Sequence, residues 1–499
     1  VRRSRGDAGG SGDGVRDRSR SPHHQRWKTE TELDDGVPQP PRFNPKRTPG
    51  VQPPLNMGNP PPGEIFSHFF DAAVFKLLCE NTNKNAAKNL EKGTKFIWTE
   101  INPDEMKKFV GMLLYMAVLK LPRISDFWRQ QKIFHVPFPA TVMSRDRFMA
   151  VLSNLHLSDP EQNEDNDKKK GTEDYDHLHR FRPLMEIICV NCKAIYHPRQ
   201  HLAVDERMVG TKARLSIKQY MKAKPTKWGL KFFVLADMNG YTIDFILYTG
   251  KSKWASGKGL SFDVVAGLVN NLGSGYIIYT DNFYTSPLLF RHLRQQGFGA
   301  CGTYRVPKLW QLPGDKQLRK EGRGESVSAV RKSPELAITK WFDNKPVLMG
   351  STVHGKEPED ICGVDLCDRM LSFYRMLNRT KKWTSHVITH YFDVAITNSW
   401  IQYKSNSKVL NRPAKNTEQY LDFKLHLAEE LLDSPELNDS SEDSEEEYKP
   451  PTKMRIPQPE CSQLRRRRHC AKRLGPACAP TKGELSLNHG LSPAFSPIR

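Results

Sequence analysis

The chain carries an apolar run broken by charge at Leu202-Ala203-Val204-Asp205-Glu206-Arg207. A second run of this kind, Tyr276-Ile277-Ile278-Tyr279-Thr280-Asp281-Asn282, also leads into an aspartate. Short runs rich in Val, Ile and Tyr predict buried strands. An unpaired buried charge is expensive, so a carboxylate at the end of such a strand is poorly placed for stability. It is well placed to hold a hard cation.

A third aspartate, Asp365, lies in Gly363-Val364-Asp365-Leu366-Cys367-Asp368. Residues 366–376 predict a helix, and Asp365 and Asp368, three residues apart, share one face of it. Each acid also has an ordinary interpretation: Asp205 as a partner of Arg207, Asp281 as an Asx-turn and Asp365 as a helix cap. Carboxylates at two strand ends and one helix start are explained together by one site for two divalent ions, which can promote attack on a phosphodiester.

The elements around the first two acids predict an α/β fold. Strands are expected at residues 202–209, 230–236, 241–248, 276–281 and 299–304, and helices at residues 264–271 and 286–296. Three successive strands followed by alternating helix and strand predict a mixed sheet with helices on both faces. Asp205 then lies on the first strand and Asp281 on the fourth, and we expect these strands to be neighbours.

The remaining segments predict a helical domain before this sheet and an insertion after it. Within them we expect helices at residues 103–121, 144–157, 184–196, 366–376 and 386–403, strands at 326–330 and 338–342, and an exposed loop at 159–174. The predicted organisation is a disordered basic tail (1–62), a helical domain (63–200), the first part of the sheet domain (201–306), an insertion (307–350), the final helices (351–411) and a mostly disordered tail (412–499).

The formal net charge of +20 predicts a polyanionic partner. No apolar stretch approaches the roughly 18 residues of a membrane-spanning helix, so nucleic acid is favoured over a membrane. No acid occurs between Glu206 and Asp237, and aromatic residues are interleaved there, as in sites that contact phosphates and bases. The DNA-contacting residues predicted here are Arg207, Lys212, Arg214, Lys218, Lys222, Lys224, Lys227, Trp228 and Lys231. A solvated basic surface is the alternative.

A second basic stretch follows Asp368 and predicts a continuation of the DNA path. Its candidate residues are Arg375, Arg379, Lys381, Lys382 and Trp383. An ordinary basic helix end is the alternative.

The nine cysteines are scattered, which is typical of reduced thiols in the cytosol or nucleus. Cysteines and histidines in the last 40 residues have irregular spacings, so we do not expect Zn²⁺ there. Residues 465–473 are rich in arginine and predict a nuclear localisation signal, hence a nuclear protein.

Four motifs in order resemble those of the piggyBac transposases and the piggyBac transposable element-derived proteins of vertebrates. They are Ala203-Val204-Asp205-Glu206, Lys224-Pro225-Thr226-Lys227-Trp228-Gly229-Leu230-Lys231, Tyr279-Thr280-Asp281-Asn282-Phe283-Tyr284-Thr285-Ser286 and Gly363-Val364-Asp365-Leu366-Cys367-Asp368. The similarity runs from about residue 66 to residue 403. Two features depart from the family pattern: the segment before Gly363 is short, and the C-terminal cysteine pairs are not intact.

The resemblance implies a ribonuclease H-like catalytic domain, interrupted by an insertion and preceded by a helical dimerisation and DNA-binding domain. It implies that Asp205, Asp281 and Asp365, with Asp368 as a fourth acid, hold two Mg²⁺ ions. It also implies a homodimer that binds double-stranded DNA and carries out cut-and-paste transposition at TTAA sites. Two functions stay open at this point: a DNA transposase, or a catalytically inactive DNA-binding protein derived from one.

Overall fold

The computed structural model describes residues 38–52, 59–222, 224–250, 256–304, 314–332, 335–354, 363–376 and 382–433. Several predictions lie outside these ranges. They concern the contacts of Arg379 and Lys381, the short segment before Gly363, the zinc question and the nuclear localisation signal.

Most strands in the described residues belong to one nine-stranded mixed sheet, ordered β4-β5-β3-β7-β8-β11-β10-β9, with β6 also paired to β5. The strands are β3 (His201–Gly210), β4 (Gln219–Tyr220), β5 (Trp228–Asp237), β6 (Thr242–Leu247), β7 (Ile277–Thr280), β8 (Gly299–Thr303), β9 (Ser326–Lys332), β10 (Glu335–Phe342) and β11 (Pro346–Ser351). β3, β7 and β8 are parallel neighbours, and β5 is antiparallel to β3. The predicted adjacency of the first and fourth strands is therefore confirmed.

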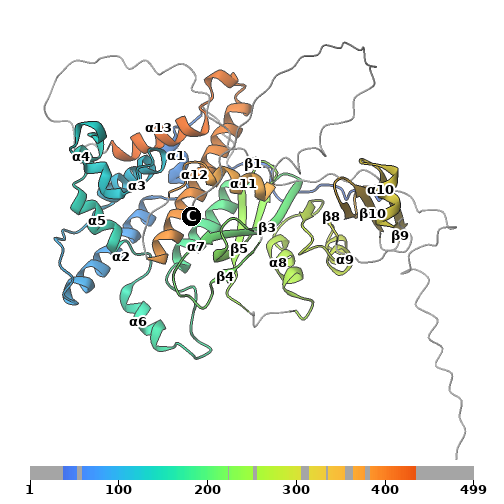
Figure 1. Ribbon diagram of the computed structural model, residues 1–499, viewed down its shortest axis with the longest axis horizontal. Coiled ribbons are helices and arrows are strands. Elements are labelled where there is room, and N and C mark those ends of the chain that lie inside the picture. The colour runs from blue at the N-terminus through green and yellow to red at the C-terminus, as the bar shows by residue number, and fades with distance from the viewer. Residues whose placement is uncertain are drawn as a thin grey trace, which may run out of the picture. The chain divides into compact units, whose positions relative to one another are not determined.

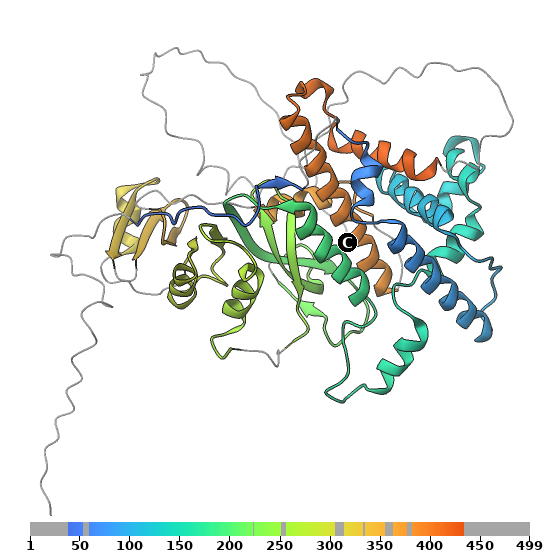
Figure 2. The ribbon, with the colours of Figure 1, turned by 180° about the vertical axis from the view of Figure 1, so that it is seen from behind.

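Helices cover both faces of this sheet. After the first strands come α8 (Leu260–Val269), α9 (Pro287–Gln295), α10 (Asp315–Glu321), α11 (Gly363–Ser372), α12 (Trp383–Val409) and α13 (Tyr420–Leu432). Successive side chains of a strand point to opposite faces. Phe232 contacts His390 and Tyr391 of α12, whereas Phe233 contacts Tyr284, just before α9. The predicted α/β class, a mixed sheet between helices, is confirmed (Figures 1 and 2).

Residues 62–195 form a series of helices joined by loops. The helices are α1 (Pro62–Ser67), α2 (Ala72–Glu91), α3 (Pro103–Val118), α4 (Phe138–Val142), α5 (Arg145–Asn154), α6 (Pro160–Lys168) and α7 (Arg182–Ile195), with 3-10 turns at Ile124–Trp128 and Lys132–Phe134. Side-chain caps start four of them: α2, α3, α5 and α6, capped by Asp71, Asn102, Ser144 and Asp159. Their buried faces form one continuous hydrophobic core with the sheet.

The predicted exposed loop at residues 159–174 is wrong in its first half, where α6 forms. The helix has Pro160 in its first turn, and the Asp159 carboxylate accepts the Glu161 N–H. The buried side chains of this helix include two asparagines, and it has no apolar stripe. Asn163 forms hydrogen bonds with Ser158 and His156, and Asn166 forms hydrogen bonds with the backbone of Asp176. Apolar periodicity therefore carried no signal for this helix.

His156 makes the fold acid-sensitive. The ring is buried, and burial, helped by the positive charges of Lys382, Arg180 and Lys88, lowers the pKa of His156 to about 3. The unfolded chain takes up its proton near pH 6.5, so the free energy of unfolding should be highest above that pH. It should fall by about 1.4 kcal/mol per pH unit for this group as the pH drops from 6.5 toward 3. Urea unfolding at pH 7, 6 and 5 measures the slope.

The His156→Gln protein is the comparison, because it removes the titrating ring and leaves two other buried histidines, His197 and His390, in place. Between pH 6.5 and pH 3 its free energy of unfolding should decline by about 1.4 kcal/mol less per pH unit than that of the natural protein. Equal slopes for the two proteins would contradict the assignment.

Two segments predicted as disordered contain ordered structure. In the N-terminal segment, β1 (Gly50–Val51) pairs with β2 (Tyr196–His197), and Phe43 packs edge-on against Tyr276 at 5.0 Å. Beyond residue 412, α13 packs against α3 and buries Phe423, Leu427 and Leu431. Both predicted boundaries therefore lie too close to the middle of the chain.

The predicted insertion contributes the far end of the same sheet. β11 pairs with β8 antiparallel through Met349, Gly350 and Ser351, and β10 and β9 follow in turn. β10 lies between β11 and β9 and buries its residues 336–339.

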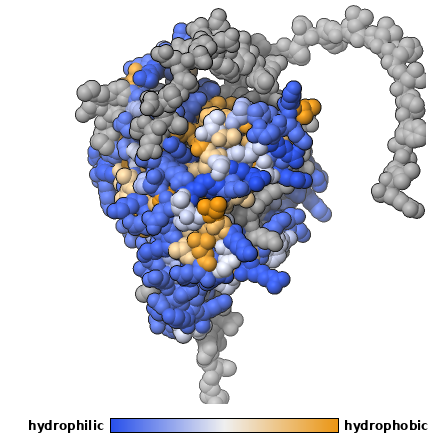
Figure 3. All heavy atoms as spheres, turned by 90° about the vertical axis from the view of Figure 1, so that its left-hand side faces the viewer, coloured by the Kyte–Doolittle hydropathy of each residue, from blue (hydrophilic) through white to orange (hydrophobic). Residues whose placement is uncertain are grey.

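No described helix is long and apolar enough to cross a membrane. Figure 3 views the protein from the side of α4 and α5, where the surface is mainly hydrophilic and apolar residues form only small groups.

Candidate functional site

Asp205 and Asp281 lie side by side in the sheet. β3 and β7 pair in parallel, with Val204 opposite Thr280. Asp205 follows Val204 and Asp281 follows Thr280, so the two aspartates are neighbours. Their side chains belong to the same face, together with His201 and Tyr279, which hydrogen-bond to each other at 3.0 Å. Asp281 stands where β7 ends, and its Oδ1 accepts the Phe283 N–H at 2.8 Å, which forms the Asx-turn considered from the sequence.

α11 brings Asp365 and Asp368 to the same side of the sheet. The helix packs on β3 and β5, and Gly363 lies so close to the carbonyl of Asp237 that a Cβ there would be only 2.6 Å from it. Asp365 is exposed in the first turn of α11. Asp368, one turn later, forms an ion pair with Arg207, in which Oδ1 lies 2.5 Å from Nε.

The prediction that Arg207 contacts DNA is not compatible with its position. Its side chain is buried, and its guanidinium donates to Asp368 and, at 3.0 Å, to Sγ of Cys367. A buried guanidinium needs such partners, and it has no surface to offer a phosphate. Arg207 instead ties β3 to α11, and so connects the strand of Asp205 to the helix of Asp365.

Burial and neighbouring acids raise the pKa values of Asp205 and Asp281. Burial raises the pKa of Asp205 to about 7, Glu206 and Asp281 add to the rise, and Lys224 opposes it. Burial also raises the pKa of Asp281, again with a contribution from Glu206. Perturbed carboxylates of this kind concentrate at functional sites. Here the main cause is burial, which disfavours the charged carboxylates, and for Asp205 the nearby Lys224 offsets part of it.

A lysine lies among these acids. Nζ of Lys224 is 3.4 Å from Asp205 Oδ2, donates to the Glu206 carbonyl at 2.9 Å and lies 3.6 Å from Glu206 Oε1. In the described part of the chain, no three Asp, Glu, His or Cys side chains come together closely enough to hold a metal ion. The oxygen donors suit Mg²⁺ chemically, but in this arrangement they do not form its site.

Residues 211–228, which join β3 to β5 and are called the basic connection below, present the predicted cations to solvent. Lys212, Arg214, Lys222 and Lys227 are exposed there. The rings of Tyr220 and Trp228 lie 4.8 Å apart and are about half exposed, at 51% and 54%, and Nζ of Lys218 lies 5.3 Å from the centre of the Trp228 ring. Exposed rings among cations are suited to contact bases and phosphates.

Other predicted DNA contacts have structural partners. Lys382 donates to the carbonyls of Ser153 and Leu155 at the end of α5, and Trp383 packs edge-on against Phe181. Lys231 is half-buried, with Nζ 4.8 Å from the ring centres of both Phe233 and Phe283. Arg375 is half-buried after α11. The second basic stretch thus stabilises the fold at Lys382 and Trp383.

Sequence reasoning passed over Glu206 as a site residue. Its side chain is buried, it belongs to the opposite face from Asp205, and its Oε2 accepts from the Tyr284 hydroxyl at 3.4 Å. The signal was available, because an acid directly after Asp205 in a buried strand needs a partner as much as Asp205 does.

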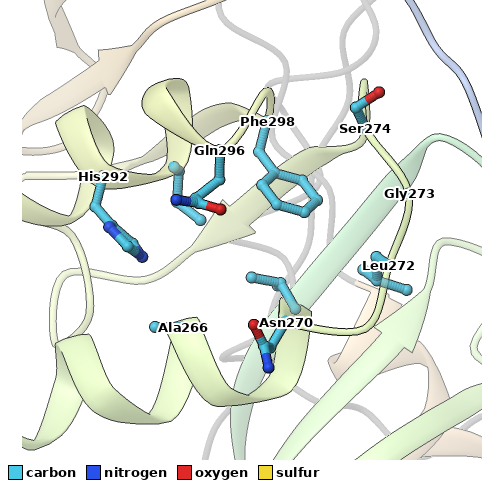
Figure 4. Close-up of a pocket in the computed structure, with 10 residues that line it drawn as sticks. Ala266, Asn270, Leu272, Gly273, Ser274, His292, Gln296 and Phe298 are labelled. Carbon is cyan, nitrogen blue, oxygen red and sulfur yellow. The ribbon is translucent and has the colours of Figure 1, made fainter.

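A cavity of about 420 Å³ lies elsewhere, between α8, α9 and the loop before β7. Asn270, His292, Gln296 and Phe298 contribute to its lining (Figure 4), which includes none of the four predicted acids. It is therefore separate from the candidate site.

Comparisons with known proteins agree with this fold and with the motifs. A family profile described as "Transposase IS4" matches residues 61–363. Human PiggyBac transposable element-derived protein 3 is 26% identical over 379 residues, which are 69% of this chain and 61% of that protein. Human PiggyBac transposable element-derived protein 2 is 25% identical over 376 residues, which are 68% of this chain and 61% of that protein. The match spans about three fifths of the length of each of these relatives.

Among solved structures, the cryo-EM structure of a piggyBac transposase synaptic complex with hairpin DNA superposes with a TM-score of 0.65. The match has 22% sequence identity and covers 79% of this chain and 86% of that one. The fold is therefore that of a piggyBac transposase, which is ribonuclease H-like. The chain belongs to the Transposase IS4 family, and the resemblance to the piggyBac group is confirmed.

Proposed function

We propose that the protein binds double-stranded DNA through the basic connection and acts on it as a piggyBac-type transposase, with Asp205, Asp281 and Asp365 serving metal-dependent cleavage and strand transfer. The observation that carries the proposal is the position of the basic connection, which runs from the end of β3, the strand of Asp205, and returns Lys224 to that aspartate. The family implies dependence on a divalent ion in general, which would stabilise charge on the reacting phosphate oxygens. The solved relative with this fold was captured with hairpin DNA.

A second function is favoured by one specific observation. Because the described acids do not converge and Lys224 lies between two of them, a DNA-binding protein without cleavage is the alternative. Both functions share the same DNA surface, and they differ in whether a divalent ion supports strand cleavage. A homodimer, a nuclear location and TTAA targets belong to the proposal through the resemblance to the family.

DNA binding should depend on salt and on the exposed lysines of the basic connection. Each phosphate contact contributes about 0.9 to the slope of log K against log salt concentration. The Lys222→Gln, Lys227→Gln double variant should therefore bind a duplex more weakly, with a slope reduced by about 1.8. Fluorescence anisotropy between 50 and 200 mM salt, roughly the range over which such contacts are lost, measures both quantities.

The matched control is Lys408→Gln with Lys415→Gln, which removes the same charge from exposed positions near the end of α12 and after it. It should leave the slope close to that of the natural protein. An identical slope for all three proteins would remove the basic connection from the DNA surface.

A further inference from the structure

Lys224 takes the position of a cation within the acidic group. It lies in the turn between β4 and β5, and its side chain folds back over β3 so that Nζ reaches an oxygen of Asp205 and two oxygens of Glu206. The side chain is mostly buried, at 23% exposure, so these contacts replace water around the ammonium. A lysine that only solubilised the surface would point outward, as Lys222 and Lys227 do in the same turn.

The electrostatics extend to all of the predicted acids. Burial alone would lower the pKa of Lys224, but Asp205, Glu206, Asp368 and Asp365 outweigh burial and raise it. Lys224 in turn favours the charged form of Asp281. The direct contacts of this ammonium are with Glu206 and with Asp205, one of the residues that the resemblance assigns to metal binding.

We infer that Lys224 is an internal counter-ion of the acidic group, which keeps the acids from gathering around a divalent ion until DNA on the basic connection draws the lysine away. This inference rests on the proposed function, and it deepens that function by making metal binding conditional on DNA. An ammonium and a divalent cation cannot share the same carboxylate oxygens. A phosphate beside the turn offers Lys224 an alternative anion, which compensates for the carboxylates that it leaves.

The turn itself supplies the connection between DNA and the acids. The Met221 N–H donates to the carbonyl of Lys227 at 2.8 Å, and the Lys224 N–H donates to the carbonyl of Met221 at 3.4 Å. Lys224 is thus held in the same small hydrogen-bonded turn as the exposed Lys222, Lys227 and Trp228. A shift of this turn on a DNA backbone moves the ammonium relative to β3.

Thermodynamic linkage gives the expected size of the coupling between DNA binding and metal binding. If DNA raises the affinity for a divalent ion, the ion raises the affinity for DNA by the same factor, and typical coupling factors are about 5- to 150-fold. A permanent, purely structural salt bridge makes the opposite prediction: its removal would destabilise the protein without strengthening the binding of a metal ion.

The test uses Mn²⁺ as the probe and the full chain, with bound Mn²⁺ measured by titration calorimetry and by the electron paramagnetic resonance signal of the free ion. The Lys224→Gln protein retains a donor for the Glu206 carbonyl and should bind Mn²⁺ about tenfold more tightly than the natural protein. A saturating short duplex should tighten Mn²⁺ binding to the natural protein by a similar factor, about tenfold, and should have little effect on the variant. Thermal melting establishes that the variant is folded.

The control is Lys408→Gln, which removes the same charge from an exposed side chain in the last turn of α12, outside the basic connection. It should keep the Mn²⁺ affinity of the natural protein and the response to duplex. Equal or weaker Mn²⁺ binding by folded Lys224→Gln would overturn the inference and leave the proposed function intact. Failure of duplex to tighten Mn²⁺ binding to the natural protein would overturn it without any variant. Absence of Mn²⁺ binding in every protein, with and without duplex, would overturn both the inference and the metal-dependent part of the proposed function.

Discussion

The Asp281→Asn protein is expected to nick duplex DNA in the presence of Mg²⁺ at least about 10²-fold more slowly than the natural protein, since even small misplacements in such a site cost that much. Asparagine keeps the shape of the side chain and can still accept the Phe283 N–H, so the turn after β7 should survive. What is lost is the negative charge beside Asp205. Nicking of a supercoiled plasmid, with Mg²⁺ and with a chelator, measures the effect.

Asp104→Asn is the matched control, because it removes one carboxylate from an exposed position on α3, outside the candidate site. It should nick DNA at the rate of the natural protein. If the natural and Asp281→Asn proteins cleave equally well, Asp281 has no catalytic role. If the natural protein binds duplex but never cleaves it with Mg²⁺ or Mn²⁺, the alternative function is the correct one.

The Lys424→Met protein is expected to lose about 3–5 kcal/mol of its free energy of unfolding, the usual cost of removing one partner of a buried ion pair. Lys424 and Asp393 are both almost fully buried, with Nζ 3.9 Å from Oδ1. Burial lowers the pKa of Lys424 to about 8 and raises the pKa of Asp393 to about 6, and each partner opposes the shift of the other. Methionine fills a similar volume and leaves the carboxylate of Asp393 without its ammonium.

This pair also holds the chain that follows α11. Lys424 donates to the carbonyls of Phe373 and Tyr374, and the Asp393 carboxylate accepts the Met376 N–H. Tyr374 has a φ of 51°, a backbone conformation that a tyrosine adopts only when its surroundings compensate. The pair therefore supports the turn behind the helix that carries Asp365.

Urea unfolding measures the loss, with the exposed Lys415→Met protein as the control, for which little change is expected. The Lys424→Met, Asp393→Asn double variant should be less destabilised than the sum of the two single variants, because it leaves no buried charge. A loss below about 1 kcal/mol for Lys424→Met would place the pair among the ion pairs that contribute little.

The sheet that carries the site could be predicted because its strands are buried and β-branched. The strand expected at residues 202–209 is β3 at His201–Gly210, and the one expected at residues 276–281 is β7 at Ile277–Thr280. Their parallel pairing was not predicted from the sequence; in the structure the connection between them passes through β5, β6 and α8, which is long enough for the crossover that a parallel neighbour needs. The pattern placed Asp205 and Asp281 at the ends of buried strands, whereas the structure was needed to establish that these strands are paired neighbours.

The partners of individual charges were not accessible in this way. Nothing local distinguishes Arg207 or Lys224 from the lysines that follow them, yet Arg207 is buried against Asp368, 161 residues away in the chain. α13 was missed because its apolar residues alternate with acids and lysine, although Phe423, Leu427 and Leu431 have helical spacing. Periodicity shows which residues are buried in one element, whereas ion pairs depend on which elements meet.

The pairing of β11 with β8 has a consequence for anyone who shortens the protein. Excision of residues 307–350 would leave β8, the neighbour of the strand that leads to Asp281, without its outer partner. Its open backbone groups would then be free to recruit a strand from another molecule, so such a truncated protein should precipitate or form filaments. Expression trials that aim for soluble protein need to retain residues 307–350.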